Sequence, residues 1–276
     1  MIGFGPLVSA SWLRDHRGEP RLRIIDLRWY MDGRPGDEAY AAAHIPGAAF
    51  IDLDRDITAA KGPGRHPLPG RDQFQGALRK AGVNRGDRVV VYDDAGGFSA
   101  GRLWFLLRYF GHDEVALLDG GLQAWGEPTE SGRQETPAGD FEAGEPQRHW
   151  VVDRAAVAAR PPETVLLDAR AGDRYRGEVE PLYPRAGHIP GAVNAVWTDN
   201  LNLDLTFKSA EELRRNYVSL GVREGRDVVA SCGSGVSACI DLIGLEVAGI
   251  KGARLYEGSF GEWSEAADAE VATGPS

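Results

Sequence analysis

The sequence is poor in cysteine, with only Cys232 and Cys239 among its 276 residues. Two cysteines seven residues apart do not make the disulfide framework of a small secreted domain, and their spacing is not that of a zinc site. We therefore expect a reduced, cytoplasmic protein that needs no metal and no other cofactor.

Long apolar runs and basic runs are also missing. No stretch approaches 18 apolar residues, and the N-terminal segment lacks a basic region followed by an apolar core. We therefore expect neither a membrane span nor a secretory signal. Lysine occurs only four times, and the formal net charge is −10 with no compensating basic run. That balance argues against nucleic acid as the main partner.

The chain does contain one pattern written twice. Four blocks of the first half return in the same order in the second, which indicates a duplicated domain. The pairs are AHIPGAAFIDLD with GHIPGAVNAVWTD, IIDLR with LLDAR, GVNRGDRVVVYD with GVREGRDVVASC, and LLDGGLQAW with LYEGSFGEW.

Within each half, short apolar strands alternate with segments of helical spacing. This alternation predicts an α/β fold with two tandem domains, each a mainly parallel sheet flanked by helices on both faces. We place the domains at residues 1–126 and 149–276. The segment 127–148 between them is rich in Pro, Gly and Glu without apolar periodicity, and we interpret it as a linker.

The stretch around Cys232 carries the chemistry. A β-prone run, 228–231, is followed by Cys-Gly-Ser-Gly and then by helical apolar spacing from Val236. Glycines let the backbone N–H groups of such a loop point inward, and the start of a helix adds partial positive charge. Such an environment favours the thiolate near neutral pH. The alternative interpretation is that Cys232 is a buried structural cysteine. The glycines around it favour the interpretation as a reactive cysteine.

The two halves differ at this decisive position. Asp93 stands where the second half has Cys232, and its loop, DDAGGFSA, is one residue longer than CGSGVSA. A carboxylate cannot act as a thiol nucleophile, so we expect the first domain to be inactive and to support the second.

Taken together, the repeated blocks and the Cys232 loop resemble the tandem-domain rhodanese family of sulfurtransferases over nearly the whole chain. The resemblance implies covalent catalysis, in which Cys232 takes a sulfane sulfur from a small donor and a thiol or cyanide acceptor collects it. The loop Cys-Gly-Ser-Gly-Val-Ser is similar to that of the 3-mercaptopyruvate class. Thiosulfate enzymes typically carry basic residues after the cysteine, and thiosulfate is the alternative donor. The acceptor is expected to be a thiol, such as that of a thioredoxin-like protein.

The resemblance also implies roles for other residues. Ser234 and His44 would complete a proton relay with Cys232, with the acidic partner of His44 left open between Asp32 and Asp37. Phe98, where the mercaptopyruvate class has tyrosine, departs from the pattern. His188 is interpreted as structural. The implied donor-binding residues are Arg174, Arg185 and Glu180, with the loop residues Gly233, Gly235, Val236 and Ser237.

Two further classes of function were weighed against this one. A phosphatase or arsenate reductase would use an arginine six residues after the cysteine to bind a tetrahedral anion, but that residue is Ala238. A non-catalytic binding module would not need the intact Cys232 loop. The physiological acceptor, the oligomeric state and the role of Cys239 stay open.

Overall fold

The computed structural model describes residues 4–275, and contacts between residues divide this range into two units. Unit 1 comprises residues 4–59, 68–147 and 202–207, and unit 2 comprises 60–67, 148–201 and 208–275. Two short stretches, 60–67 and 202–207, thus cluster with the half to which the repeat does not assign them. The interpretation of the N-terminus as lacking a signal falls partly on residues 1–3, outside the described range.

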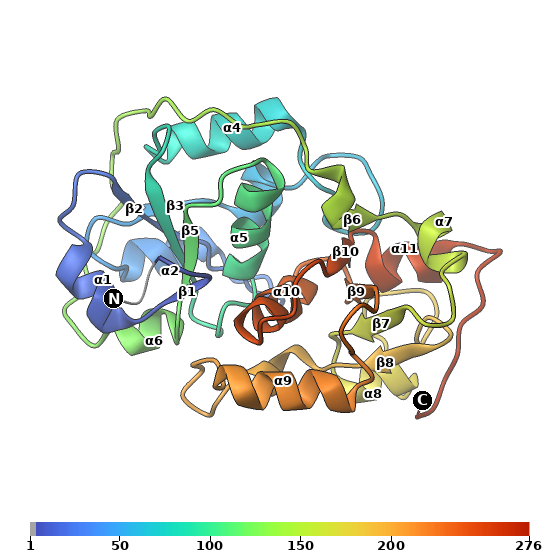
Figure 1. The fold of residues 1–276 in the computed structure, drawn as a ribbon. Helices are drawn as coiled ribbons and strands as arrows, with labels where there is room; N and C mark the ends of the chain where they lie inside the picture. Colours follow the sequence, from blue (N-terminus) through green and yellow to red (C-terminus); the bar gives the residue numbers. More distant parts are fainter. Residues whose placement is uncertain (1–3, 276) are drawn as a thin grey trace. The chain divides into compact units, whose positions relative to one another are not determined.

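Each unit is built on a five-stranded, fully parallel sheet (Figure 1). In unit 1 the strand order is β1 (Leu7–Val8), β5 (Val115–Leu118), β4 (Arg88–Tyr92), β2 (Leu22–Asp26) and β3 (Ala49–Phe50). In unit 2 it is β6 (Val151–Val152), β10 (Arg254–Tyr256), β9 (Val228–Ser231), β7 (Val165–Asp168) and β8 (Ala192–Asn194). The identical order confirms the duplicated α/β fold, and the short outer strands β1, β3, β6 and β8 are additions that the sequence did not indicate.

The middle strands are apolar because neighbouring strands and helices cover them. All four residues of β7 and of β9 are buried. Parallel strands covered on both faces are read as continuous apolar runs rather than alternating ones. The central strand of each sheet is β4 or β9. Asp93 follows the end of β4 and Cys232 follows the end of β9, so each lies beside the middle of its sheet.

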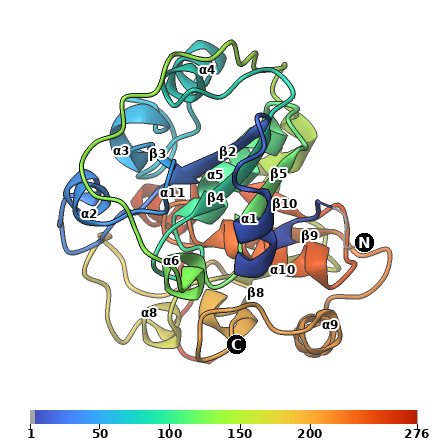
Figure 2. The ribbon, with the colours of Figure 1, turned by 90° about the vertical axis from the view of Figure 1, so that its left-hand side faces the viewer.

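Helices flank both sheets, and in unit 1 the helices α1 and α6 lie on one side and α5 on the other (Figures 1 and 2). Side-chain caps begin several of them: Ser9 accepts from the N–H of Trp12, and Ser209 forms a capping box with Glu212. The α-helices are α1 (Ala10–His16), α2 (Gly36–Ala42), α3 (Leu53–Asp56), α4 (Arg71–Lys80), α5 (Ala100–Tyr109), α6 (Gly121–Trp125), α7 (Arg154–Ala158), α8 (Gly172–Arg176), α9 (Ala210–Ser219), α10 (Ala238–Val247) and α11 (Ser259–Glu265).

The predicted linker, 127–148, contains no helix or strand before Arg148 opens a short 3₁₀ turn at Arg148–Trp150. It nevertheless packs on unit 1. Phe141 is 1% exposed, and its carbonyl accepts a hydrogen bond from Arg79 at 2.7 Å. The segment therefore belongs structurally to unit 1, up to Gln147.

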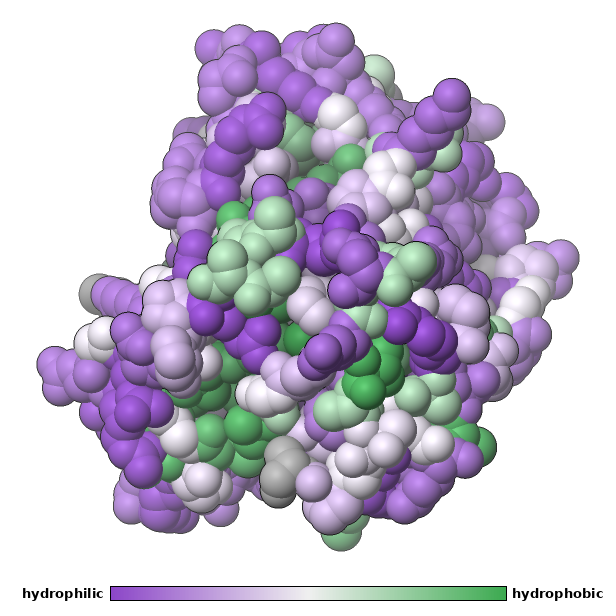
Figure 3. Space-filling model, turned by 90° about the vertical axis from the view of Figure 1, so that its right-hand side faces the viewer, coloured by the Kyte–Doolittle hydropathy of each residue, from purple (hydrophilic) through white to green (hydrophobic). Residues whose placement is uncertain are grey.

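One face of the molecule is mainly polar. Hydrophilic residues cover most of the face in Figure 3, and apolar ones lie in separate groups between them. Among the described residues, no helix is long and apolar enough to cross a membrane.

Candidate functional site

Cys232 follows the central strand β9 and is 1% exposed. The start of α11 fixes the backbone around it. The N–H groups of Phe260 and Gly261 donate to the carbonyls of Cys232 and Gly233, both at 2.9 Å. In the other direction, the N–H of Cys232 donates to the hydroxyl of Ser259 at 3.1 Å. The backbone of Cys232 is thus held on both its N–H and its carbonyl side by the start of α11.

The loop after Cys232 presents backbone donors. The N–H of Gly235 points at the Cys232 sulfur at 3.1 Å. Within residues 4–275, no acceptor is found for the N–H groups of the other loop residues. The hydroxyls of Ser234 and Ser237 likewise make no hydrogen bond there. This donor-rich loop suits an anionic sulfur. The residues with open N–H groups are Gly233, Ser234, Val236, Ser237 and Ala238.

The equivalent loop of unit 1 shows what such a cradle binds. The carboxylate of Asp93 accepts the N–H groups of Ala95 and Gly97 on one oxygen and those of Ser99 and Ala100 on the other, at 2.8–2.9 Å. The loop of the first repeat is therefore closed around its own anion. In unit 2 the shorter side chain of Cys232 leaves the matching donors for a ligand.

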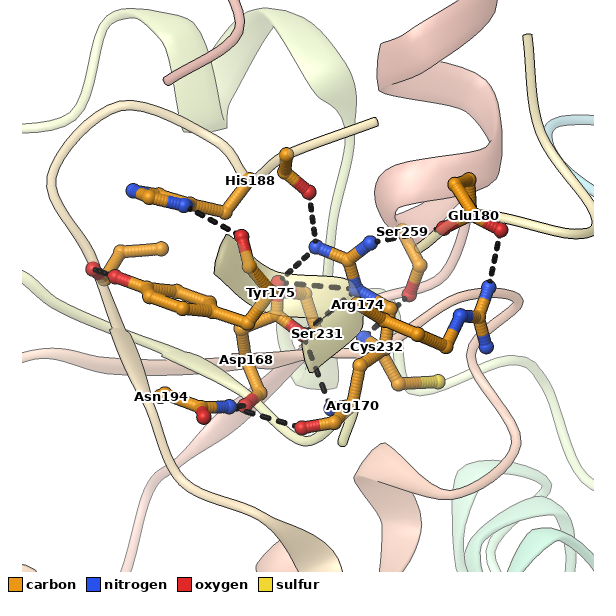
Figure 4. Close-up of polar contacts among 12 residues, drawn as sticks. Asp168, Arg170, Arg174, Tyr175, Glu180, His188, Asn194, Ser231, Cys232 and Ser259 are labelled. Atoms are coloured by element: carbon orange, nitrogen blue, oxygen red, sulfur yellow. Dashed lines mark hydrogen bonds and ion pairs between the residues drawn. The ribbon is translucent and has the colours of Figure 1, made fainter. Parts of the chain in front are cut away.

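A buried cation stands beside Cys232, although the loop itself has none. Arg170 forms a forked ion pair with Asp168 and a second one with Glu180 at 3.3 Å (Figure 4). Its guanidinium also lies 3.8 Å from the ring centre of Phe260. Burial lowers the pKa of Arg170, but Asp168, Glu180 and the charge of Cys232 outweigh burial and raise it overall. Arg170 therefore stays charged.

Arg174, on the short helix α8, has one N–H group without a hydrogen-bond partner among the described residues. Its Nη2 donates to Glu180 at 2.7 Å, and its side chain is 15% exposed. Its Nε is buried, and no partner for it is present among the described residues. An unpaired buried donor on a guanidinium is costly unless a ligand completes it. The role of Arg174 in binding the donor's carboxylate stays a prediction, for which this N–H is an available donor.

Two other predicted donor-binding residues have different contacts. Glu180 is 2% exposed and joins Arg170 to Arg174, so it orients the two cations and would repel a carboxylate donor. Arg185 donates to four backbone carbonyls at the end of α11 and just beyond, at 2.6–2.9 Å. It neutralises the helix's C-terminal end, and a direct substrate contact by either residue has no support in this geometry.

His44 also differs from the prediction. It is completely buried in unit 1, stacks on Tyr40 with ring centres 4.1 Å apart, and pairs its Nδ1 with the Tyr40 carbonyl at 2.8 Å. His188 repeats this arrangement with Tyr175 in unit 2. Both histidines therefore brace the turn of their repeat. The relay predicted for His44 is not supported, and neither Asp32 nor Asp37 contacts its ring in the described structure.

Sequence reasoning missed two residues that contact the Cys232 loop, Ser259 and Tyr183, and one buried histidine of unit 2, His66. Ser259 has φ +51°, a left-handed conformation unusual for a non-glycine residue, and the matching residue of unit 1 is Gly121 with φ +58°. The exchange of glycine for serine between the repeats was a readable signal. Tyr183 lies over the loop, and His66, 2% exposed, belongs to the stretch 60–67 that clusters with unit 2. Nothing in the sequence pattern indicated these two placements.

Comparison with known proteins agrees with the fold and the site. The model of the rhodanese-like domain matches residues 9–128 and again 153–266. A Pseudomonas aeruginosa protein named probable 3-mercaptopyruvate sulfurtransferase is 44% identical over 281 residues, covering 97% of this chain and 98% of its own. The 3-mercaptopyruvate sulfurtransferase of Escherichia coli K12 is 36% identical, covering 96% of each chain.

The thiosulfate alternative has a counterpart among the relatives. A mitochondrial thiosulfate/3-mercaptopyruvate sulfurtransferase of Arabidopsis thaliana is 34% identical, over 96% of this chain and 78% of its own. Among solved structures, the 3-mercaptopyruvate sulfotransferase SseA of Escherichia coli superposes with a TM-score of 0.84 at 35% identity, covering 92% of this chain and 98% of that one.

Proposed function

The chain belongs to the rhodanese-like family and is a sulfurtransferase, and we propose that its sulfur donor is 3-mercaptopyruvate. The observation that carries the choice of donor is the position of charge around Cys232. The loop has no side-chain cation beside the sulfur, whereas Arg174 offers a buried, unpaired Nε further away. A carboxylate at the far end of the donor suits this arrangement better than a compact dianion.

In the proposed first step, the Cys232 thiolate attacks the donor's sulfur. The carbon–sulfur bond breaks, its electron pair passes into the enolate of pyruvate, and Cys232 becomes a persulfide. Enolate protonation then gives pyruvate. Arg174 holds the carboxylate during this step, and Arg170, through its charge, favours the thiolate. Glu180 acts as a positioning residue that fixes both guanidinium groups.

The persulfide then rests in the loop. The donors that match those around Asp93 are the N–H groups of Gly235, Ser237 and Ala238. We assign the outer sulfur to this cradle, together with Gly233, Val236 and the hydroxyl of Ser234, which would hydrogen-bond the transferring sulfur or relay a proton. In a second step, a thiol attacks the outer sulfur and restores the Cys232 thiolate. A thioredoxin-like protein is the proposed type of acceptor.

The cytoplasm is the proposed location, because both cysteines are free thiols and a reducing compartment keeps them so. Thiosulfate is the second candidate donor, and the buried charge of Arg170 beside Cys232 is the observation that favours it. With thiosulfate, sulfite instead of pyruvate would leave.

A single-turnover experiment tests the proposal. The protein is mixed with one equivalent of 3-mercaptopyruvate without acceptor, and pyruvate release is followed beside the mass of the Cys232 peptide. We expect one pyruvate and one added sulfur per chain. Absence of pyruvate, with sulfur added only from thiosulfate, would contradict the proposal.

A further inference from the structure

Tyr183 is pinned over the Cys232 loop by its neighbours in the chain. Three residues before it, Glu180 is fixed by two arginines. Two residues after it, Arg185 is fixed to the carbonyls at the end of α11. The segment between these anchors therefore has little freedom, and Tyr183 lies in its middle.

Two glycines make room for the Tyr183 ring. A methyl group built on Gly233 would lie 2.8 Å from the Tyr183 hydroxyl oxygen, and one on Gly261 would lie 3.0 Å from its Cε1. Real side chains do not tolerate the first of these contacts without moving, so the hydroxyl sits directly over the residue that follows Cys232. Phe260 packs edge-on against the ring, with centres 6.2 Å apart.

The electrostatic surroundings keep this hydroxyl protonated. Burial, and secondly the charge of Cys232, raise the pKa of Tyr183 to about 12, and Arg174 and Arg65 oppose them in part. Arg174 lies 5.5 Å from the ring centre. Arg65 comes from the stretch 60–67, whose Gly64 approaches Gly258 so closely that an added methyl would lie 2.5 Å from the Gly258 carbonyl oxygen. The hydroxyl is thus a neutral donor next to the Cys232 loop, and its pKa responds to the charges of Cys232, Arg174 and Arg65.

This donor has no partner inside the protein: within residues 4–275 the Tyr183 hydroxyl makes no hydrogen bond. Arg174, next to it, has its unpaired Nε. Two hydrogen-bond donors next to the Cys232 loop are thus without a partner in the described part of the chain, the guanidinium N–H of Arg174 and the hydroxyl of Tyr183. They match a ligand that has a carboxylate for the first and a carbonyl oxygen for the second. In an α-keto acid these two groups are on adjacent carbons.

We infer that Tyr183 is a specificity-determining residue, which donates a hydrogen bond to the keto oxygen of the sulfur donor. The inference rests on the proposed function. When the carbon–sulfur bond breaks, the electron pair moves onto this oxygen as the enolate forms, so the hydrogen bond strengthens in the transition state. No proton has to leave Tyr183. Thiosulfate has no carbonyl group and forms no enolate when its sulfur–sulfur bond breaks, so this gain in the transition state is specific to the keto acid.

The test compares Tyr183→Phe with the unaltered protein. The ring and its packing stay, and a hydroxyl without a partner is removed, so folding is retained. We expect kcat for 3-mercaptopyruvate to fall by about 10- to 100-fold, with a change of less than about twofold for thiosulfate. Tyr30→Phe, which removes a hydroxyl bonded to Asp94 in unit 1, is the matched control and should change neither. Unchanged turnover of 3-mercaptopyruvate, or equal losses with both donors, would overturn the inference.

A binding measurement separates this inference from the proposed function. Pyruvate should protect Cys232 from iodoacetamide, and Tyr183→Phe should raise the pyruvate concentration needed for half protection by about 5- to 20-fold. Protection that is equal in both proteins overturns the role of Tyr183 even where pyruvate is the true product. If the unaltered protein prefers thiosulfate and Tyr183→Phe still weakens protection by pyruvate, the proposal of 3-mercaptopyruvate as the donor is wrong. The hydrogen bond from Tyr183 to a keto oxygen is then retained.

Discussion

Gly235 donates its backbone N–H to the sulfur of Cys232 at 3.1 Å, just as Gly97 donates to the carboxylate of Asp93 at 2.8 Å in the first repeat. The two loops share this donor although one is a residue longer. The two repeats thus share one arrangement of backbone donors, which the Asp93 carboxylate fills in the first repeat and where we propose that the transferred sulfur binds in the second.

The first prediction concerns which cysteine carries the sulfur. Cys232→Ser should abolish turnover, because a hydroxyl at this position is not ionised near neutral pH. Cys239 lies inside α10 and donates its thiol to the Gly235 carbonyl at 3.4 Å. Cys239→Ala should therefore keep most of the activity, and peptide mass spectrometry should place the added sulfur on Cys232. Sulfur on Cys239 would disprove the assignment.

The second prediction concerns Arg174. A charge-assisted hydrogen bond contributes about 1.5–3 kcal/mol, so Arg174→Ala should lower kcat/KM for 3-mercaptopyruvate by about 10- to 150-fold. Arg174→Lys should give an intermediate loss, since it keeps the charge without the planar fork. Arg176→Ala on the same helix removes only an exposed pair with Glu178 and serves as the control.

Alkylation by iodoacetamide distinguishes the roles that Arg174 can have. The rate at Cys232 should stay near normal in Arg174→Ala, because the neutral reagent reports on the thiolate alone. A large fall in that rate would mean that Arg174 acts on the thiolate, and kinetics like those of the unaltered protein would remove it from the site.

The third prediction separates strain from function at Ser259. Its left-handed backbone costs roughly 1–2 kcal/mol, and its hydroxyl accepts the N–H of Cys232. Ser259→Ala keeps the strain and loses the acceptor, so unfolding free energy should fall by about 1–3 kcal/mol. Ser259→Gly should be more stable than Ser259→Ala by about 1 kcal/mol, and both should lose turnover. Chemical denaturation checks the order, and a glycine variant of full activity would contradict the role.

The fourth prediction concerns the buried carboxyl group of Asp241 on α10. Burial raises its pKa to about 8, with hydrogen bonds from Asn200 and Tyr217 opposing and the charges of Asp168 and Asp199 adding. The folded state thus keeps a proton that the unfolded state has lost above about pH 4. Stability should therefore fall as pH rises from about 4 to about 8. Asp241→Asn should flatten this dependence in denaturation series, and an unchanged slope would refute the assignment.

The fifth prediction compares His44 of unit 1 with His66 of unit 2. His44→Gln should lower stability, because its ring is buried against Tyr40, while the protein that remains folded keeps its turnover. His66 belongs to the unit of Cys232, so His66→Gln should reduce turnover. The reverse pattern would restore His44 to the relay.

The repeat was the feature that made the fold predictable. The matched blocks predicted the strands after which Asp93 and Cys232 follow, and the loop sequence predicted Cys232 as the nucleophile. Pattern could not tell whether a histidine before Ile-Pro-Gly faces a site or a core, since that depends on what stacks against it. In the structure both His44 and His188 stack on a tyrosine of their own unit, so the relay role of His44 stays a prediction that the fifth test decides.

The remaining residues were hidden by long-range packing. Tyr183 reaches the loop only because Gly233 and Gly261, far apart in sequence, are both without side chains. Arg185 carried the expected charge, but the carbonyls at the end of α11 engage it. A motif shows which residues are present, whereas their partners are determined by elements that the motif does not contain.

The most direct test of the account is kcat/KM for 3-mercaptopyruvate and for thiosulfate, measured side by side with cyanide as the acceptor. The loop has no side-chain cation, and we propose that Arg174 and Tyr183 donate hydrogen bonds to an α-keto acid. The kcat/KM for 3-mercaptopyruvate should therefore be higher than that for thiosulfate by at least about tenfold. A higher value for thiosulfate would contradict the account of the site.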